Sequence, residues 1–438
     1  MIIRLPFKIF FGVLVSLGWM ACSSSSSLQE RLAENMAQKI QMVRDSHETT
    51  LGLNNFQLKA VPKDVLSLTH LVRLDLMDNW IEDYAPLRAL SFLNELSLHH
   101  NEMKDLSSLR SLTQVKELTL SANQIRDLSP LQSLPQLTHL NLNNNHITDL
   151  FPLKGMAQLE DFQAAANQIR DVSVCRAFVN LKTLFVPENQ IQDISVLKNL
   201  SQLTYLDVSD NQIREIQPIR SLHQLRRLYL GGNPILDFSV IRHLPQLEDL
   251  DLRGTSVSNI DFVASLKQLE RLTLRIHPTC DLSVLQTLKK LTDLNLWESQ
   301  LKSLNGLQKL TQLTELGLNE NQIQDLTPLQ HLTQLNTLHL EGNQIQDLKS
   351  LRTLTQLTQL YLNENQIKDL ASLPPLSQLR VLDLKNNQIK NFNLDLTQFP
   401  KLDWVHLEGN PIENLPKELL DGDAAKIRAY QASKARNQ

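Results

Sequence analysis

Aromatic and arginine side chains recur at one fixed interval in the middle of this chain. Tyr205 and Arg227 lie 22 residues apart, and so do Asp207 and Tyr229. Tyr, Trp and Arg suit macromolecular recognition, because they bury much surface at small entropic cost and carry directional hydrogen-bond donors. We predict a partner-binding surface made of Phe185, Tyr205, Asp207, Arg227, Tyr229, Asp251, Arg253, Arg271, Arg275 and Trp297.

Motifs for catalysis and for metal binding are missing from the sequence. It contains no G-x-x-x-x-G-K-[ST] loop, no H-E-x-x-H pair and no C-x-x-C pair. Adjacent His99 and His100 would point to opposite faces of a strand, and Asp105 recurs at 22-residue intervals as a turn residue would. Cys175 and Cys280 are about five repeats apart, too far for a disulfide. We therefore predict no enzyme activity, no cofactor and no metal site.

The element that must position the recognition residues is a short repeat. Residues 310–331, LTQLTELGLNENQIQDLTPLQH, return 22 residues later as LTQLNTLHLEGNQIQDLKSLRT. The polar slot held by Asn321 can be counted from Phe56 to Asn410, at intervals of 22 residues except the first and the last, which are 23. A fixed short period predicts a solenoid of stacked units.

One unit explains why these residue types return. Leu316 and Leu318 alternate with polar residues, which predicts a short strand with one apolar face. Asp325 precedes a Leu-x-Pro-Leu stretch and reads as the cap of a 3₁₀ or helical turn. Asn321 lies where the chain leaves the strand, and its amide can satisfy buried backbone groups within and between units. Neither half buries its leucines alone, so the units must stack.

Residues 310–332 nearly spell LxxLxxLxLxxNxIxDLxPLxxL. The repeat thus resembles the leucine-rich repeat family, specifically the 22-residue bacterial class typified by internalins. The resemblance covers roughly residues 51–416. It implies an α/β fold, a right-handed, curved solenoid with a parallel β-sheet on its concave face and short 3₁₀ or helical turns on its convex face. Adhesion or invasion does not follow from the resemblance.

Two features leave alternatives open. Thr255, His277 and Ser299 replace asparagine in three consecutive slots, which indicates either local drift with a kink or a deformation that shapes a binding surface.

The aromatic and arginine surface also has a plainer interpretation. One column of alternating charge would only stabilise neighbouring strands, by at most about 1 kcal/mol per exposed pair. That column is Arg227, Asp249, Arg271 and Asp293.

The N-terminus has the composition of a secretion signal. Arg4 and Lys8 precede an uncharged apolar run, residues 9–20, that is too short for a comfortable membrane span. The sequence that ends at Cys22 and continues in serines resembles a bacterial lipoprotein signal, although Trp19 replaces the usual leucine. The resemblance implies that Cys22 is lipidated and becomes the first mature residue. A plain cleaved signal and an uncleaved anchor are the alternatives.

The ends of the array are expected to be capped. Apolar residues at helical spacing predict a helix over 28–45 that covers the first unit, and residues 417–433 predict a second helix interrupted near Gly422. No internal domain boundary is predicted. The expected organisation is 1–22 lipoprotein signal peptide, 23–27 serine tether, 28–50 N-terminal capping helix, 51–416 solenoid of about 17 units, and 417–438 C-terminal capping helix and tail.

Together these patterns predict a non-enzymatic, envelope-anchored protein that binds a protein partner through its concave face. Envelope glycan is the second candidate ligand, and an intracellular scaffold or regulatory subunit is the alternative if residues 1–22 are not processed. Serine rather than aspartate after Cys22 implies export to the outer membrane or cell surface in lipoproteins of this type. The formal net charge of −4 predicts no nucleic-acid partner, and we expect a monomer.

Overall fold

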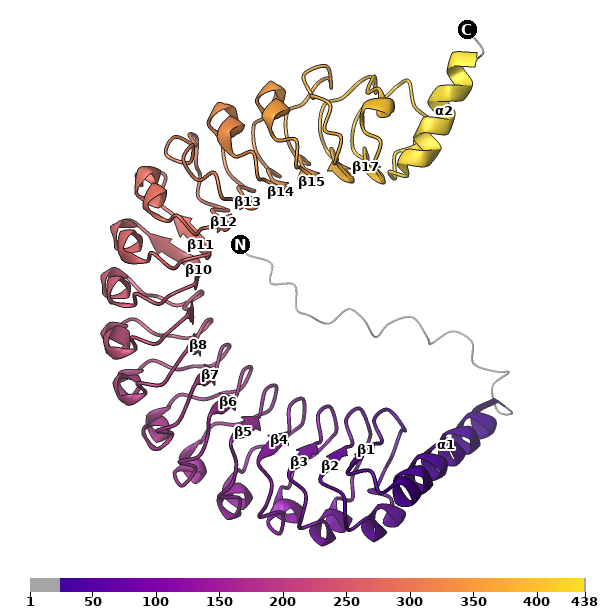
Figure 1. Ribbon diagram of the computed structural model, residues 1–438, viewed down its shortest axis with the longest axis vertical. Coiled ribbons are helices and arrows are strands. Elements are labelled where there is room, and N and C mark those ends of the chain that lie inside the picture. The colour runs from indigo at the N-terminus through magenta and orange to yellow at the C-terminus, as the bar shows by residue number, and fades with distance from the viewer. Residues whose placement is uncertain (1–23, 437–438) are drawn as a thin grey trace. The chain divides into compact units, whose positions relative to one another are not determined.

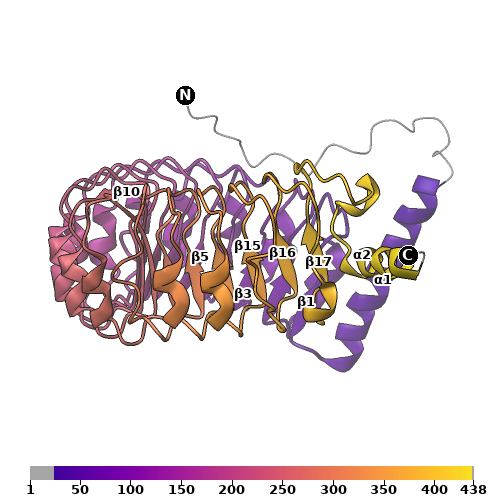
Figure 2. The same ribbon diagram turned by 90° about the horizontal axis from the view of Figure 1, so that it is seen from above.

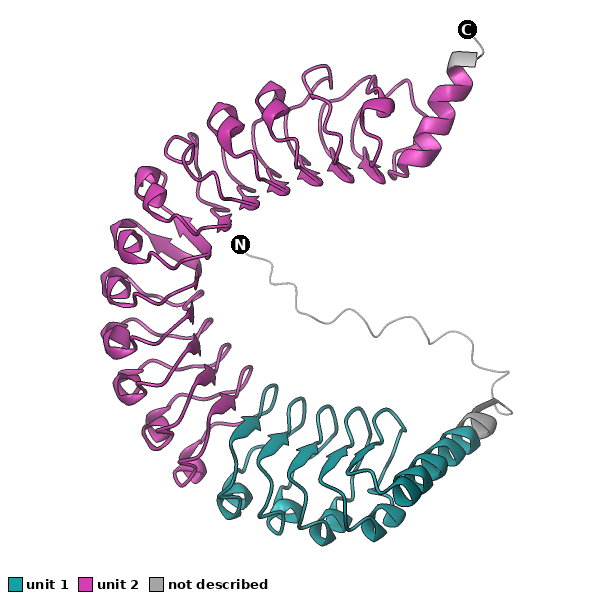
Figure 3. Ribbon diagram, in the orientation of Figure 1, with its two compact units in different colours: residues 1–146 teal, residues 147–438 magenta. Residues whose placement is uncertain are grey.

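The computed structural model describes residues 24–436, so the predicted signal, the lipidation site Cys22 and Ser23 lie outside the described residues. The chain forms two compact units, residues 1–146 and 147–438 (Figure 3). The 22-residue period continues through residue 146 without a change, which is why the sequence predicted no boundary there. Within residues 24–436, none of the helices has both the length and the apolar character that a membrane span needs.

Unit 1 opens with the helix α1 (Ser24–Ser46) and continues as an array of short strands and 3₁₀ turns. Each strand pairs in parallel with the next one along the chain. The strands are β1 (Thr50–Gly52), β2 (Arg73–Asp75), β3 (Glu95–Ser97), β4 (Glu117–Thr119) and β5 (His139–Asn141). The 3₁₀ turns are η1 (Lys63–Ser67), η2 (Ala85–Ala89), η3 (Ser107–Leu109) and η4 (Ser129–Ser133).

Unit 2 has the same plan over more repeats. Its strands line the inner side and its 3₁₀ turns the outer side (Figure 1), and each strand again pairs in parallel with the next. The strands are β6 (Asp161–Gln163), β7 (Thr183–Phe185), β8 (Tyr205–Asp207), β9 (Arg227–Tyr229), β10 (Asp249–Val257), β11 (Arg271–Ile276), β12 (Asp293–Asn295), β13 (Glu315–Gly317), β14 (Thr337–His339), β15 (Gln359–Tyr361), β16 (Val381–Asp383) and β17 (Trp404–His406). The predicted parallel sheet with short 3₁₀ turns is confirmed.

Most repeats of unit 2 place one 3₁₀ turn between successive strands, and a helix ends the unit. The turns are η5 (Phe151–Leu153), η6 (Ser173–Ala177), η7 (Ser195–Asn199), η8 (Gln217–Ser221), η9 (Ser239–His243), η10 (Asp261–Ser265), η11 (Leu282–Thr287), η12 (Thr327–His331), η13 (Lys349–Thr353), η14 (Leu396–Gln398) and η15 (Lys417–Leu419), followed by the helix α2 (Ala424–Arg436). Leu326 is the N-cap residue of η12, one position later than the predicted Asp325. Asp325 still opens the turn, because its Oδ1 accepts a hydrogen bond of 2.8 Å from the N–H of Thr327, the first residue of η12.

The core of each repeat is built from the leucines of the consensus. The central residue of each strand points away from the solvent, and Leu206, Leu228 and Leu250 are fully buried. Burying one such side chain stabilises the fold by roughly 1.5–3 kcal/mol. Because the leucines of one repeat contact those of its neighbours, the core is continuous along a unit.

Asn211, where the chain leaves β8, shows what the repeated asparagine does. Its Nδ2 donates to the carbonyl oxygens of Val208 (3.1 Å) and Ser209 (3.0 Å) in its own repeat. It also donates to the Val186 carbonyl oxygen of the preceding repeat (3.0 Å), and its Oδ1 accepts from the N–H of Ile191 there (2.9 Å). One amide therefore satisfies backbone groups of two neighbouring repeats, which confirms the prediction. The same four bonds recur at Asn189, Asn233, Asn321, Asn343, Asn365 and Asn387.

The ends of the two arrays are covered in different ways. Helix α1 buries Ile40 and Val43. It starts at Ser24, before the predicted 28, so that the helix includes serines that the sequence assigned to a tether. At the other end, α2 lies beside β17 (Figure 1, Figure 2). Gly422, at φ +108°, separates η15 from α2, and its carbonyl oxygen accepts from the N–H of Val405 at 2.7 Å. This pairing covers the free edge of β17.

The shared amide predicts a large loss of stability for Asn211→Ala. The substitution leaves buried backbone groups of two repeats without a partner, and we expect the free energy of unfolding to fall by about 2–4 kcal/mol. Urea titration followed by circular dichroism measures the change. Asn363→Ala is the matched control, since the Asn363 side chain makes no hydrogen bond to any described residue. Equal effects of the two substitutions would contradict the role assigned to the slot.

Candidate partner-binding face

The ten residues predicted to bind a partner all belong to unit 2. Nine of them lie on the neighbouring strands β7 to β11, and Trp297 lies two residues after the end of β12. The parallel register places Phe185 opposite Asp207, Asp207 opposite Tyr229, and Tyr229 opposite Asp251. The structure therefore brings the residues of this prediction together on the inner side of five adjacent strands and at the end of a sixth. We call this surface the β7–β12 face.

An aromatic row crosses the first three strands of the face. The ring centroids of Phe185 and Tyr205 are 6.4 Å apart, and those of Tyr205 and Tyr229 are 5.4 Å apart, with tilted rings in both pairs. All three side chains are partly exposed. Burial raises the pKa of Tyr205 to about 12, so its hydroxyl stays neutral and can donate at physiological pH. Tilted aromatic pairs at these distances stabilise one another, which holds the row in place.

Asp249 connects the aromatic row to the charged part of the face. One of its oxygens, Oδ2, accepts a hydrogen bond of 2.8 Å from the hydroxyl of Tyr229 and another of 2.8 Å from Nε of Arg271. Both donors are fixed by one carboxylate, which is itself mostly buried. The sequence placed Asp249 on this surface but did not include it among the binding residues. Its two contacts depend on side-chain conformations that residue spacing does not specify.

The alternating-charge column forms only in part. Arg271 pairs with Asp249, while Arg227 makes no ion pair or hydrogen bond with any described residue through its guanidinium. Asp293 lies opposite Arg271 in the register, yet the guanidinium of Arg271 turns to Asp249 instead. Burial, and then the negative charge of Glu315, raise the pKa of Asp293 to about 6. Strand stabilisation by a continuous ladder therefore does not account for this column.

Asp251 and Asp207 are buried beneath the face and hydrogen-bond to residues of their own repeats. The sequence predicted that both would contact a partner. Asp251 is only 4% exposed and accepts hydrogen bonds from N–H (2.8 Å) and Nε (2.6 Å) of Arg253. Asp207 is 9% exposed and accepts from the N–H (2.9 Å) and hydroxyl (2.6 Å) of Ser209. Carboxylates this deeply buried are satisfied by the neighbours that they fix.

Gly231 gives Arg253 its position. A Cβ added at Gly231 would lie 2.7 Å from Cγ of Arg253 and 2.8 Å from its carbonyl oxygen. The arginine side chain therefore lies across the backbone of the preceding repeat, where only glycine leaves room. This role of Gly231 was not predicted from the sequence, where its only signal is a glycine at an inward-facing position beside an arginine.

The three repeats without the usual asparagine depart from the regular geometry. Strands β10 and β11 extend to nine and six residues, and their register shifts between Leu252 and Val257. His277 does not replace the missing amide, because its side chain is exposed and its Nδ1 lies 2.7 Å from the Thr279 hydroxyl. Ser299 does so in part, since its hydroxyl accepts a 3.0 Å hydrogen bond from the N–H of Ile276. The deformation falls on the strands that carry Arg253 and Arg275, and its role in shaping a binding surface stays a prediction.

Arg275 and Trp297 form the far side of the face. Nε of Arg275 donates to the carbonyl oxygen of Glu298 at 3.1 Å, and Nη1 lies 3.7 Å from the Glu298 carboxylate. Trp297 is partly exposed beside this pair, and its backbone N–H donates to Oδ1 of Asn295 at 3.2 Å. Arg275 is therefore held by a side-chain hydrogen bond and Trp297 by a backbone hydrogen bond, and part of each side chain stays exposed.

No cluster of His, Cys, Asp or Glu among residues 24–436 could hold a metal ion. Cys175 and Cys280 are free thiols, as predicted, and burial raises the pKa of the Cys175 thiol to about 12.

Comparison with known families and structures agrees with the repeat. A family model described as "Leucine Rich repeats (2 copies)" matches residues 91–133, 179–219, 201–243 and 333–375, and a model described as "Leucine Rich Repeat" matches residues 136–154. No curated protein matches the chain in sequence.

Several solved structures resemble this one. An internalin, InlF, from Listeria monocytogenes is 30% identical, with a TM-score of 0.51 over 79% of this chain and 93% of that one. A Leptospira interrogans leucine-rich repeat protein is 26% identical, with a TM-score of 0.64 over 90% and 96% of the two chains. The functional domain of InlJ from Listeria monocytogenes is 25% identical, with a TM-score of 0.58 over 82% and 73%.

The raised pKa of Asp293 predicts a pH-dependent cost to stability. Because the carboxyl holds its proton more tightly in the folded state, stability is lost as the pH rises from about 4 to about 6 and stays lower above that range. Asp293→Asn should raise the free energy of unfolding at pH 7.5 by about 1 kcal/mol and have no effect near pH 4. Urea titrations at both pH values measure this.

Asp325→Ala serves as the control of opposite sign. The hydrogen bonds from Thr327 lower the pKa of Asp325, so its ionised form stabilises the fold and that contribution is lost as the pH falls. A gain in stability for Asp293→Asn that is equal at both pH values would show that the buried charge is not its cause.

Proposed function

From the membership of this chain in the leucine-rich repeat proteins, we propose that it binds a protein partner through the β7–β12 face and catalyses no reaction. Leucine-rich repeat proteins generally mediate protein–protein interaction, and solenoids commonly use their inner surface for it. The observation that carries the proposal is the aromatic row of Phe185, Tyr205 and Tyr229, held by neighbouring rings and by Asp249.

Preorganisation supports a protein ligand. The aromatic rings and the guanidinium groups of Arg253, Arg271 and Arg275 are fixed by contacts inside the protein, so that little conformational entropy is lost when a partner covers them. Aromatic side chains and arginines of this kind dominate the energy of protein interfaces. The unpaired guanidinium of Arg227 adds a charge that an acidic group of the partner would neutralise.

Envelope glycan is the second candidate ligand, and a different part of unit 2 favours it. The rings of His339 and Tyr361 are parallel within 5°, with centroids 4.5 Å apart. Trp404, which is 49% exposed, stacks with His406 at 6.2 Å. Flat aromatic surfaces of this type also suit sugar rings. Two results together would favour glycan as the ligand: envelope oligosaccharides inhibit partner binding, and substitution of Tyr205 does not.

We further propose that the chain is exported and held at the outer membrane or cell surface by a lipid on Cys22. The support is the sequence alone: the basic residues Arg4 and Lys8, the short apolar run and the serines that follow the cysteine. An intracellular scaffold is the alternative. It requires that residues 1–22 remain on the protein.

The triple substitution Tyr205→Ala, Arg227→Ala and Trp297→Ala tests the face. Each residue is partly or fully exposed, so the fold should persist, while loss of several interface anchors should weaken partner binding by more than about a hundredfold. The measurement is recovery of partners from envelope extracts of the native host, quantified by mass spectrometry.

The matched control replaces three exposed glutamines, Gln202, Gln224 and Gln246, with alanine. They precede β8, β9 and β10 and lie outside the face. Circular dichroism should be the same for both variants. If every partner is recovered equally from the two variants, the β7–β12 face is not the binding surface.

The anchor is tested by the intact mass of the protein purified from membranes of the native host. A mature chain that begins at acylated Cys22 is expected, and Cys22→Ser should move the protein out of the membrane fraction. Recovery of an intact Met1 in the unmodified protein would refute the anchor and favour the intracellular alternative.

A further inference from the structure

Five consecutive repeats of unit 2 carry one lysine or arginine each at the same register on the outer side, four of them within the 3₁₀ turns η6 to η9 and the first directly after η5. These residues are Lys154, Arg176, Lys198, Arg220 and Arg242. All five are exposed, and neither Asp nor Glu occurs in the surrounding segments 150–159, 172–181, 194–203, 216–225 and 238–247. His223 and His243 add to the same segments. We call this set of five cations the basic stripe.

None of the five cations forms an ion pair with a described residue. Arg176 and Arg242 each donate through Nε to a carbonyl oxygen of their own turn, at 3.1 and 3.0 Å, which leaves the ends of both guanidinium groups free. Lys154 lies 4.5 Å from the centre of the Phe151 ring. The positive field is evident at His243, where desolvation and then the charges of Arg220 and Arg242 lower the pKa.

One acidic residue lies directly before each of these segments. These residues are Asp149, Asp171, Asp193, Glu215 and Asp237. Asp171 and Asp193 accept hydrogen bonds of 2.7 Å from the N–H groups of Ser173 and Ser195. On the other flank, Glu160 and Glu248 pair with Lys182 and Arg226 at 2.7 and 2.6 Å. No ion pair joins a described carboxylate to a cation of the stripe, so the five cationic groups remain accessible although carboxylates flank them.

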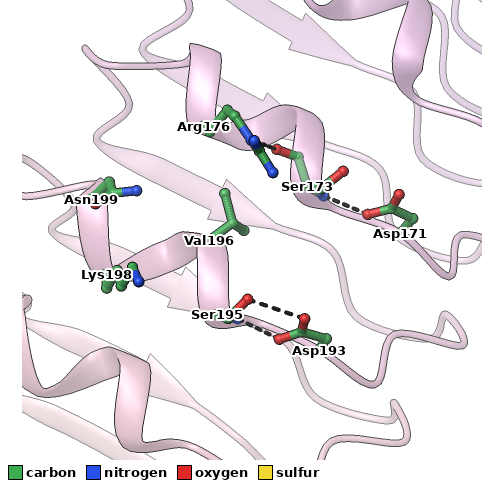
Figure 4. A pocket seen from close by; sticks show the side chains of 8 residues that line it. All are labelled: Asp171, Ser173, Arg176, Asp193, Ser195, Val196, Lys198 and Asn199. Atoms are coloured by element: carbon green, nitrogen blue, oxygen red, sulfur yellow. Dashed lines mark hydrogen bonds between the residues drawn. The ribbon is translucent and has the colours of Figure 1, made fainter.

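A hollow of about 350 Å³ opens between η6 and η7 within the stripe (Figure 4). Arg176 and Lys198 line it together with Asn199, and Asp171 and Asp193 lie on the side away from Lys198. The side of the hollow lined by Arg176 and Lys198 is open to a negatively charged group. On the other side, Asp171 and Asp193 are hydrogen-bonded to the N–H groups that begin η6 and η7.

The stripe is not needed to build a repeat. The next four repeats place Ala264, Gln286, Gln308 and Gln330 at the same register and still form their strands. A residue that folding requires would recur throughout the array, as the asparagine does. The basic residues instead gather in one run of consecutive repeats, where like charges repel one another slightly.

Exposed apolar side chains accompany the stripe. Phe151, the first residue of η5, is 61% exposed, and Val179, just after η6, is 55% exposed. Basic residues beside exposed apolar ones form the pattern of a protein surface that rests on a lipid interface, since the cations bind headgroups and the apolar groups enter the acyl boundary. Neither apolar side chain would gain from contact with a nucleic-acid backbone.

We propose that the basic stripe is a docking surface for anionic phospholipid headgroups, with Phe151 and Val179 inserted at the interface. This contact uses the outer side of unit 2 and leaves the β7–β12 face, on the inner side, open to a protein partner. The inference does not require that Cys22 be lipidated or that the partner-binding proposal be correct.

Vesicle cosedimentation of the full chain tests the proposal. The wild-type protein should bind vesicles of phosphatidylcholine mixed with phosphatidylglycerol more tightly than vesicles of phosphatidylcholine alone. Replacing the five stripe residues with glutamine should lower the partition coefficient on anionic vesicles by about a hundredfold or more. Phe151→Ser with Val179→Ser should lower it by about tenfold. Residues 1–22 are common to all variants, so their own binding cancels in the comparison.

The matched control removes five other exposed charges of unit 2 by glutamine substitution of Lys302, Lys309, Arg352, Lys368 and Lys390. It has the same net charge as the stripe variant and should bind as the wild type does. A second readout on the wild type is the salt dependence of binding. Binding to anionic vesicles should weaken strongly between about 0.1 and about 1 M salt, because the Debye length shortens from about 10 Å to about 3 Å. Equal binding by the stripe and control variants, no preference of the wild type for anionic vesicles, or capture of a DNA duplex without capture of vesicles would each overturn the proposal.

Discussion

The asparagine amide shared between neighbouring turns is the constraint on which the rest of the structure depends. A repeat that places its backbone inside a leucine core must satisfy every N–H and C=O group there, and one side chain with donors and an acceptor does this for two repeats at once. The bond from Asn211 to the Val186 carbonyl oxygen fixes the stacking distance and register together. Strand positions therefore follow from the slot, and the inward-facing residues follow from the strands.

Both surfaces proposed to bind ligands lie where this constraint is relaxed or does not apply. Thr255 and His277 do not supply the amide, and β10 and β11 lengthen there to carry Arg253 and Arg275. The outer turns carry no equivalent constraint on their exposed positions, which is why a run of cations can gather on five of them without loss of the fold. One scaffold thus presents two chemically different surfaces, an aromatic and arginine face inside and a basic stripe outside.

The sequence predicted the fold well, because the period, the leucines and the slot each determine a backbone position. It also predicted which residues share the inner side of β7–β12. It did not predict which charged groups pair there. Arg271 has a carboxylate on each neighbouring strand, and its side-chain rotamer determines that it pairs with Asp249. Spacing likewise does not reveal burial, which makes Asp207 and Asp251 supports, or the opening at Gly231 that admits Arg253.

The most direct test of the central claim, that a protein partner covers the β7–β12 face, is site-specific photocrosslinking in the native host. A benzophenone amino acid placed at Tyr205 should crosslink to one distinct protein. The same probe at Gln202, exposed in the segment between η7 and β8, should not give that product. Identical products from both positions, or no protein product from Tyr205 while Gln202 gives one, would contradict the account.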